Sequence, residues 1–128
     1  MCSSDLFPSH DTAGVGDTIS YAYTSNVTRI DLQNQTATVS ASDTDQIKNF
    51  ENVIGGSGDD TIVLKAGVGG AKGNVVNNID GGVSGSDTVS YENYSAALTI
   101  NLASGTEETG DKDILTSIEN VIGGSGKV

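Results

Sequence analysis

Residues 55–63 read Gly-Gly-Ser-Gly-Asp-Asp-Thr-Ile-Val, and this stretch decides the fold that the sequence predicts. It fits the nine-residue pattern G-G-x-G-x-D-x-U-x, where U is a large apolar residue, at every fixed position. The glycines permit positive φ in a tight turn, the aspartate supplies charge, and the apolar residue two places later can face a core. The pattern therefore predicts a turn that leads directly into a short strand.

Weaker copies of the pattern lie on both sides of this stretch. Residues 81–90 fit it with one extra residue in the loop, and residues 14–20 fit it with one residue missing. Residues 77–80 keep its second half, with Asn77 in place of the first aspartate, and residues 123–126 keep its first half. The chain thus contains several turns of one kind, one of which is intact.

A longer repeat contains these turns. Residues 17–21 (DTISY) recur as 87–91 (DTVSY), and residues 51–58 (ENVIGGSG) recur without change at 119–126. The offset falls from 70 to 68 residues between these matches, which requires only two deleted residues. Since eight identical residues in register do not arise by chance, we predict two copies of one unit.

We predict a single domain over residues 14–128, made of repeat one at 14–58, a Gly-rich join at 59–83 and repeat two at 84–128. Residues 1–13 are expected to be a leader outside the fold, either disordered or a cloning or sequencing scar. The first six residues have neither the basic nor the apolar region of a signal peptide. Repeat two ends inside its own motif, so we expect a longer array.

Short strands follow from alternating apolar and polar residues. Residues 28–32 and 98–102 alternate cleanly and predict half-buried strands. The segments 46–54 and 113–122 also fit a helical stripe, but we favour a short strand at 51–54 because it runs directly into the glycine turn. Stacked coils need only a narrow core, so we predict an all-β fold, a parallel β-roll or β-solenoid built from two repeats of about 70 residues.

Composition and charge restrict the function. The nine apolar residue types make up 35% of the chain and aromatic residues 5%, so a thick core is excluded. A net charge of −11 disfavours nucleic acid and anionic membrane surfaces, and no apolar run is long enough to span a membrane. Cys2 and His10 are the only residues of their kinds, so intrachain disulfides and cysteine-based zinc sites are also excluded.

The turns have the chemistry that calcium requires. Ca²⁺ takes six to eight oxygen ligands from carboxylates and backbone carbonyl groups. One glycine turn offers too few of them, so an ion is expected to lie between two stacked turns and to fold the chain as it binds. The same Gly-Asp turns also occur in solenoids that bind no metal, and Asp59 and Asp60 would then be solvated loop residues.

The chain resembles the RTX family, the hemolysin-type calcium-binding repeat proteins, over residues 14–126. Residues 50–60 are similar to the entry into the β-roll of serralysin-type proteases, and 87–91 followed by 98–102 resembles a spacer of the wider family. The resemblance implies a right-handed parallel β-roll, Ca²⁺ between adjacent turns, and bacterial secretion by a type I system. Its partners would be calcium ions and further repeats or an effector domain of a parent protein.

Carried over residue by residue, the resemblance implies two side-chain ligands, Asp60 and Asp87. Carbonyl ligands would come from Gly55, Gly56, Ser57, Gly58, Gly81, Gly82 and Gly85. Asp17 and Asp80, in the incomplete copies of the pattern, are further candidates. The extra residue at 81–86 and the long spacers at 20–50 and 90–118 depart from the family pattern and predict less regular stacking there.

No catalytic signature is present, so we predict a protein module that is not an enzyme. The main alternative is a calcium-independent structural or adhesin repeat of a surface protein, whose spacers form the binding face. A carbohydrate-active β-helix would need paired carboxylates. The carboxylates that could form such pairs lie in polar segments, and we expect them to be solvated: Asp43, Asp45, Glu107, Glu108, Asp111 and Asp113.

Overall fold

The computed structural model describes residues 18–26, 28–40, 42–47, 50, 52–65, 78–95, 98–107 and 113–125. In these residues every regular element is a β-strand, β1 to β12, so the prediction of an all-β chain is confirmed. The described part accordingly contains no helix of the length and apolarity needed to cross a membrane.

The strands form two six-stranded sheets. Sheet A has the order β1 (Thr18–Ser20), β5 (Asn52–Ile54), β7 (Asn78–Asp80), β11 (Ile114–Thr116), β10 (Thr106–Glu107) and β9 (Ile100–Asn101). Sheet B has the order β12 (Asn120–Ile122), β8 (Thr88–Ser90), β6 (Thr61–Val63), β2 (Arg29–Asp31), β3 (Thr36–Ser40) and β4 (Asp43–Gln46).

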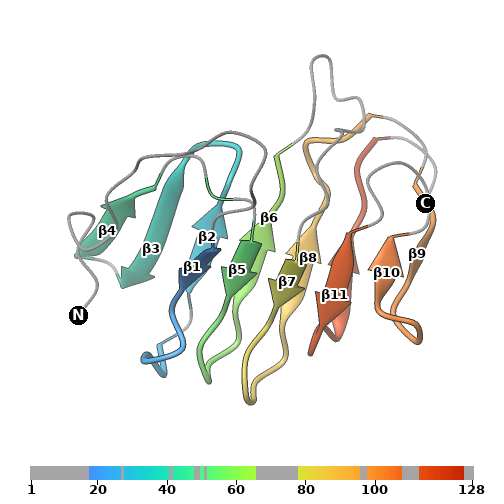
Figure 1. The fold of residues 1–128 in the computed structure, drawn as a ribbon. Coiled ribbons are helices and arrows are strands. Elements are labelled where there is room, and N and C mark those ends of the chain that lie inside the picture. Colours follow the sequence, from blue (N-terminus) through green and yellow to red (C-terminus); the bar gives the residue numbers. More distant parts are fainter. Residues whose placement is uncertain are drawn as a thin grey trace.

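Most of the pairing is parallel, because the chain alternates between the two sheets. It passes from sheet A to sheet B in four strand pairs, β1–β2, β5–β6, β7–β8 and β11–β12, and neighbouring pairs join in parallel in both sheets. The antiparallel strands lie at opposite ends (Figure 1): β3 and β4 extend sheet B beyond β2, and β10 and β9 extend sheet A beyond β11. These additions fall in the two long spacers.

The two sequence repeats have the same strand pairing. In repeat one, β1 pairs with β5, and β2, β3 and β4 form an antiparallel meander. In repeat two, β8 pairs with β12, and β9, β10 and β11 form the equivalent meander, with partners displaced by the same 70 or 68 residues. The Gly-rich join supplies β6 and β7, which lie between the repeats: β6 pairs with β2 and β8, and β7 with β5 and β11.

A narrow apolar core fills the space between the sheets, as the composition requires. Alternate strand residues point inward and are fully or almost fully buried: Ile19, Val53, Ile79 and Leu115 from sheet A, and Ile30, Ile62 and Val89 from sheet B. Tyr21, Tyr91 and Tyr94 are the largest fully buried side chains and widen the core beyond the strands. The expectation of inward-facing residues at alternate positions is therefore met at 28–32, whereas at 98–102 Leu98 is buried, Ile100 is partly buried and Leu102 is 39% exposed.

The segments that also fitted a helical stripe contain strands in the described residues. Strand β5 occupies 52–54, and β11 and β12 occupy 114–116 and 120–122. Residues 48, 49 and 51 of the first segment lie outside the described part. Parallel pairing with neighbouring strand pairs satisfies the backbone of these segments, which explains why the strand was the correct choice.

Two carboxylates that we expected to be solvated are buried. The Tyr21 hydroxyl donates to Asp45 Oδ2 (2.9 Å), and the Tyr91 hydroxyl donates to Asp113 Oδ2 (3.1 Å). Asp45 and Asp113 are only 5% and 1% exposed. The polar sequence around them concealed this, because their partners lie more than twenty residues away in the chain. The equivalent pair in each repeat links the first strand of the unit to its meander.

Tyr91→Phe should lower the free energy of unfolding by about 1–2 kcal/mol, because the ring remains packed while Asp113 loses a donor. Tyr23→Phe is the matched control: its side chain is 53% exposed, and we expect a change within about 0.5 kcal/mol. Urea denaturation of the three chains measures both values. Equal stabilities of the two variants would contradict a structural role for the buried pair.

Gln35 and Gly105 occupy equivalent places in the two meanders. Both have positive φ, 61° and 70°, and their carbonyl oxygens accept hydrogen bonds from Ile47 and Leu115 respectively. A left-handed conformation costs a residue with a Cβ roughly 1–2 kcal/mol, whereas glycine adopts it freely. Repeat one therefore holds a strained residue where repeat two has the suitable one.

Gln35→Gly should stabilise the chain by about 0.5–1 kcal/mol, after the larger entropy of glycine in the unfolded chain is subtracted. Gly105→Gln, the reciprocal change, should destabilise it, since a Cβ there also meets the carbonyl oxygen of Leu115. Thermal unfolding followed by circular dichroism checks the signs. A drop in Tm for Gln35→Gly would refute the strain at this position.

Candidate metal site at the stacked glycine turns

The turns that follow β1, β5, β7 and β11 lie side by side along the lower edge of the molecule in Figure 1. We call this edge, residues 24–26, 28, 55–60, 81–87 and 117–119, the turn edge. Backbone hydrogen bonds join neighbouring turns directly, such as Ser57 N–H to Thr24 O (3.0 Å) and Val83 N–H to Gly56 O (3.2 Å). The sequence pattern places glycine at these turns because the adjacent backbones touch.

A row of three acidic residues, Asp60, Asp87 and Glu119, runs across the turn edge, each immediately before one of the sheet B strands β6, β8 and β12. The carboxylate of each accepts a hydrogen bond from the main chain of the neighbouring turn. Thr28 N–H donates to Asp60 Oδ1 (3.0 Å), Asp60 N–H to Asp87 Oδ1 (2.7 Å), and Asp87 N–H to Glu119 Oε2 (2.8 Å). These three carboxylates therefore link all four turns.

Burial disfavours the charge on the two central carboxylates. Asp60 and Asp87 are each 1% exposed. Burial raises the pKa of Asp60, although N–H donors from Gly56 and Thr28 partly offset the effect. Burial also raises the pKa of Asp87 to about 6; the Asp60 N–H opposes this, and the carboxylates of Asp60, Glu119 and Asp59 add to it.

Nearby positive charge does not compensate this row in the described part of the chain. The ion pairs found there join Arg29 to Asp31 and Glu92, at 3.7 and 3.6 Å, and neither reaches the turn edge. Asp59 adds a further exposed carboxylate, whose Oδ1 accepts from Ser86 N–H (2.9 Å). The turn edge therefore concentrates negative charge between oxygen-rich turns.

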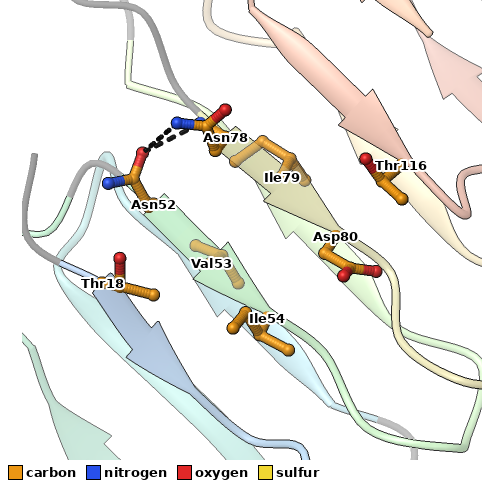
Figure 2. A pocket seen from close by; sticks show the side chains of 8 residues that line it. All are labelled: Thr18, Asn52, Val53, Ile54, Asn78, Ile79, Asp80 and Thr116. Carbon is orange, nitrogen blue, oxygen red and sulfur yellow. Dashed lines mark hydrogen bonds between the residues drawn. The ribbon is translucent and has the colours of Figure 1, made fainter.

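Most of the candidate ligands lie at this edge. The turn before β6 contains Gly55, Gly56, Ser57, Gly58 and Asp60, and the turn before β8 contains Gly81, Gly82, Gly85 and Asp87. Asp80 is the last residue of β7, and its side chain lies on the outer face of sheet A (Figure 2). Its Oδ1 accepts a hydrogen bond from Gly82 N–H (3.0 Å). Asp17 lies outside the described residues.

Sequence reasoning missed Asp59 as a binding candidate and did not consider Glu119. The signal for Glu119 was available, since it directly precedes a strand beginning Asn-Val-Ile, as Asp60 and Asp87 directly precede Thr-Ile-Val and Thr-Val-Ser. Its repeat equivalent, Glu51, lies outside the described residues. Only the stacking of the turns shows that Glu119 belongs in one row with the two aspartates.

The potential metal ligands at the turn edge suit a hard cation. They are carboxylate and carbonyl oxygens, the ligands of Ca²⁺ and Mg²⁺, with no histidine or cysteine among them. Both oxygens of Asp60 accept backbone N–H groups, and the described residues include no group of three acidic, histidine or cysteine side chains placed to hold a metal. A cation here would therefore rely mainly on turn carbonyls, supplemented by carboxylates.

A depression with a volume of about 250 Å³ lies on the outer face of sheet A, apart from the turn edge. Figure 2 shows its lining, where Asn52 Oδ1 accepts from the backbone N–H (2.9 Å) and side-chain amide (3.3 Å) of Asn78. Asp80 is the single acidic side chain in its lining, and no aromatic ring lines it. The amides of Asn52 and Asn78 stabilise the pairing of β5 and β7. Because this depression has one carboxylate and the turn edge has several, the turn edge is the stronger candidate site.

Comparison of the chain with protein-family models, with curated proteins and with solved structures gave no match. The repeated sequence and the geometry of the turn edge therefore carry the functional inference.

Proposed function

We propose that this chain is a non-enzymatic, calcium-binding repeat module of a secreted bacterial protein of the RTX class. Its strand pairs would be the coils of a parallel β-roll, and Ca²⁺ would bind at the turn edge. The observation that carries the proposal is the pair of buried carboxylates, Asp60 and Asp87, on adjacent glycine turns without a basic partner in the described residues.

The role of the ion follows from charge. Buried carboxylates in a chain of net charge −11 repel one another, and a divalent cation bound between them offsets both the repulsion and the desolvation. Asp60 and Asp87 would hold the cation together with carbonyl groups of the two turns. Because the site exists only when the turns are stacked, binding stabilises the folded chain over the unfolded one.

Secretion suits such a device. Calcium is abundant outside cells, where extracellular modules bind it with dissociation constants of about 10⁻⁴–10⁻³ M. A chain that lacks its cation retains its full self-repulsion and is easier to keep unfolded before export. Calcium would then complete the fold at its destination, and the module would serve as a scaffold for the parent protein.

Isothermal titration with calcium tests the site. The wild-type chain should bind Ca²⁺, and Asp60→Asn and Asp87→Asn should each weaken binding at least about tenfold, since each removes one charged ligand. Asp43→Asn is the matched control: it removes the same charge from the edge strand β4, three strands from β6 in sheet B, and should change the affinity less than about twofold. Equal effects of the three substitutions would contradict this site.

One observation favours a calcium-independent structural repeat as the second candidate. Both oxygens of Asp60 accept main-chain N–H groups, so the carboxylate row can hold the turns together without metal. This alternative predicts a chain that is already β-rich in chelator and unchanged by millimolar calcium. Circular dichroism in chelator, then calcium, then magnesium separates the two, since the calcium module should gain β signal or Tm with calcium alone.

A further inference from the structure

The repeat equivalence identifies one incomplete surface of the molecule. We call it the C-terminal end face: strands β9 and β12 with the side chains of Ile100, Leu102 and Val121. Their equivalents in repeat one are Ile30, Leu32 and Val53, on or directly after β2 and β5. In repeat one those strands have further partners, because β2 pairs with β6 and β5 pairs with β7.

The burial of these side chains differs between the repeats. In repeat one, Ile30 and Val53 are fully buried and Leu32 is 6% exposed. In repeat two, Leu102 is 39% exposed, and Ile100 and Val121 are only partly buried. The difference coincides with the strands β6 and β7, which cover the first set and have no counterpart beside β9 and β12 among the described residues.

Backbone donors show the same difference. Leu32 N–H donates to Val63 O (2.9 Å) and Gly55 N–H to Asp80 O (2.7 Å), which fixes the join against repeat one. For the equivalent N–H groups of Leu102 and Gly123, the described residues provide no acceptor. Among the described residues, the outer edge of β9 in sheet A and that of β12 in sheet B are therefore both unpaired.

We infer that the C-terminal end face is a docking surface for a further strand pair of the β6–β7 type, a Gly-Asp-rich segment equivalent to residues 59–83. Its first strand pairs in parallel with β9, placing an isoleucine like Ile62 opposite Ile100. Its second strand pairs in parallel with β12, placing an isoleucine like Ile79 opposite Val121. These registers are the ones that β2 and β5 form with the join.

A second folded copy of this chain does not fit the same surface. Its own β6 and β7 already pair on both sides, between its two repeats, so it offers only its ends. At the opposite end of sheet A the last strand is β1, and its inward-facing residue, Ile19, is already fully buried. The complementary occupant is therefore a segment of the join type that is not enclosed between two repeats.

The test extends the full chain by replacing residues 127–128 with a copy of residues 59–83, with a shuffled copy of the same composition as the control. The extended chain should have a Tm higher by about 5 °C or more than the shuffled control, at every protein concentration. Amide hydrogen exchange at Leu102 and Gly123 should slow at least about tenfold. Equal Tm values and equal exchange rates in the two chains would overturn the inference.

Leu102→Asp sharpens the comparison. In the unextended chain its cost should be a Tm loss of about 2 °C or less, because the side chain is 39% exposed, whereas in the extended chain it should abolish the gain. Light scattering tests whether a second copy of the chain occupies the face instead. If the unextended chain formed a concentration-dependent dimer and Leu102→Asp dissociated it, the face would be a self-association surface and our inference would be refuted. All chains are compared in one buffer at the same calcium concentration, so a difference between them does not depend on whether the turn edge binds calcium.

Discussion

Gly82→Ala should destabilise the chain by about 3 kcal/mol or more, the largest effect that we expect from a single methyl group. Gly82 has φ +116°, and a Cβ built on it meets the backbone carbonyl oxygen of Gly56 in the neighbouring turn. The strained conformation costs about 1–2 kcal/mol and the overpacking about 1–3 kcal/mol. The neighbouring turn cannot move away without loss of the hydrogen bond from Val83 N–H to Gly56 O.

Val83→Ala is the matched control for this substitution. Its side chain is 87% exposed in the same turn, so removal of two methyl groups there should change stability by less than about 0.5 kcal/mol. Urea denaturation gives both values. If Gly82→Ala unfolded at the same urea concentration as Val83→Ala, the close contact between the turns would be refuted.

In the absence of metal, the chain should be more stable at pH 5 than at pH 7, the reverse of ordinary acid unfolding. Burial raises the pKa of Asp87 from its usual value near 3.8 to about 6, and the pKa of Asp60 is raised as well. The folded state therefore binds these protons more tightly than the unfolded state. The resulting stabilisation is full below about pH 4 and is lost as the pH rises through about 6.

Thermal unfolding in chelator at pH 5 and pH 7 measures this effect, and we expect a Tm difference of at least about 3 °C. Asp87→Asn should reduce the difference, because the amide does not titrate and its oxygen can still accept from Asp60 N–H. In the metal-free state at pH 7 this variant should also exceed the wild type in stability. A wild-type Tm that rises from pH 5 to pH 7 would contradict the burial of an ionised Asp87.

The repeated motifs predicted the parallel strands well. Turn residues and alternating apolar residues are local signals, so the strands at 61–63 and 88–90, the buried isoleucines and the two-repeat organisation could be read directly. The antiparallel meanders could not. The meander residues at 36–46 include Val39 as their single large apolar side chain, and their pairing depends on contacts with β2 that no local pattern encodes.

The sequence predicted which aspartates belong to the candidate site but not the hydrogen bonds that these aspartates make. The aspartates of the pattern were identified, and they lie on adjacent turns. Their hydrogen bonds to main-chain N–H groups of the next turn depend on how the turns stack, which a single repeat does not reveal. For the same reason the buried carboxylates of Asp45 and Asp113 were misjudged, since their tyrosine partners lie far away in the chain, directly after β1 and β8.

The two-strand join also sets a parity along the molecule. Repeat one begins and ends in sheet A, the join adds one strand to each sheet, and repeat two consequently begins and ends in sheet B. The meander of repeat one therefore widens one sheet and that of repeat two widens the other. An array that kept this spacing would follow a two-fold screw, with successive meanders widening the two sheets alternately, whereas a join with an odd number of strands would make every meander widen the same sheet.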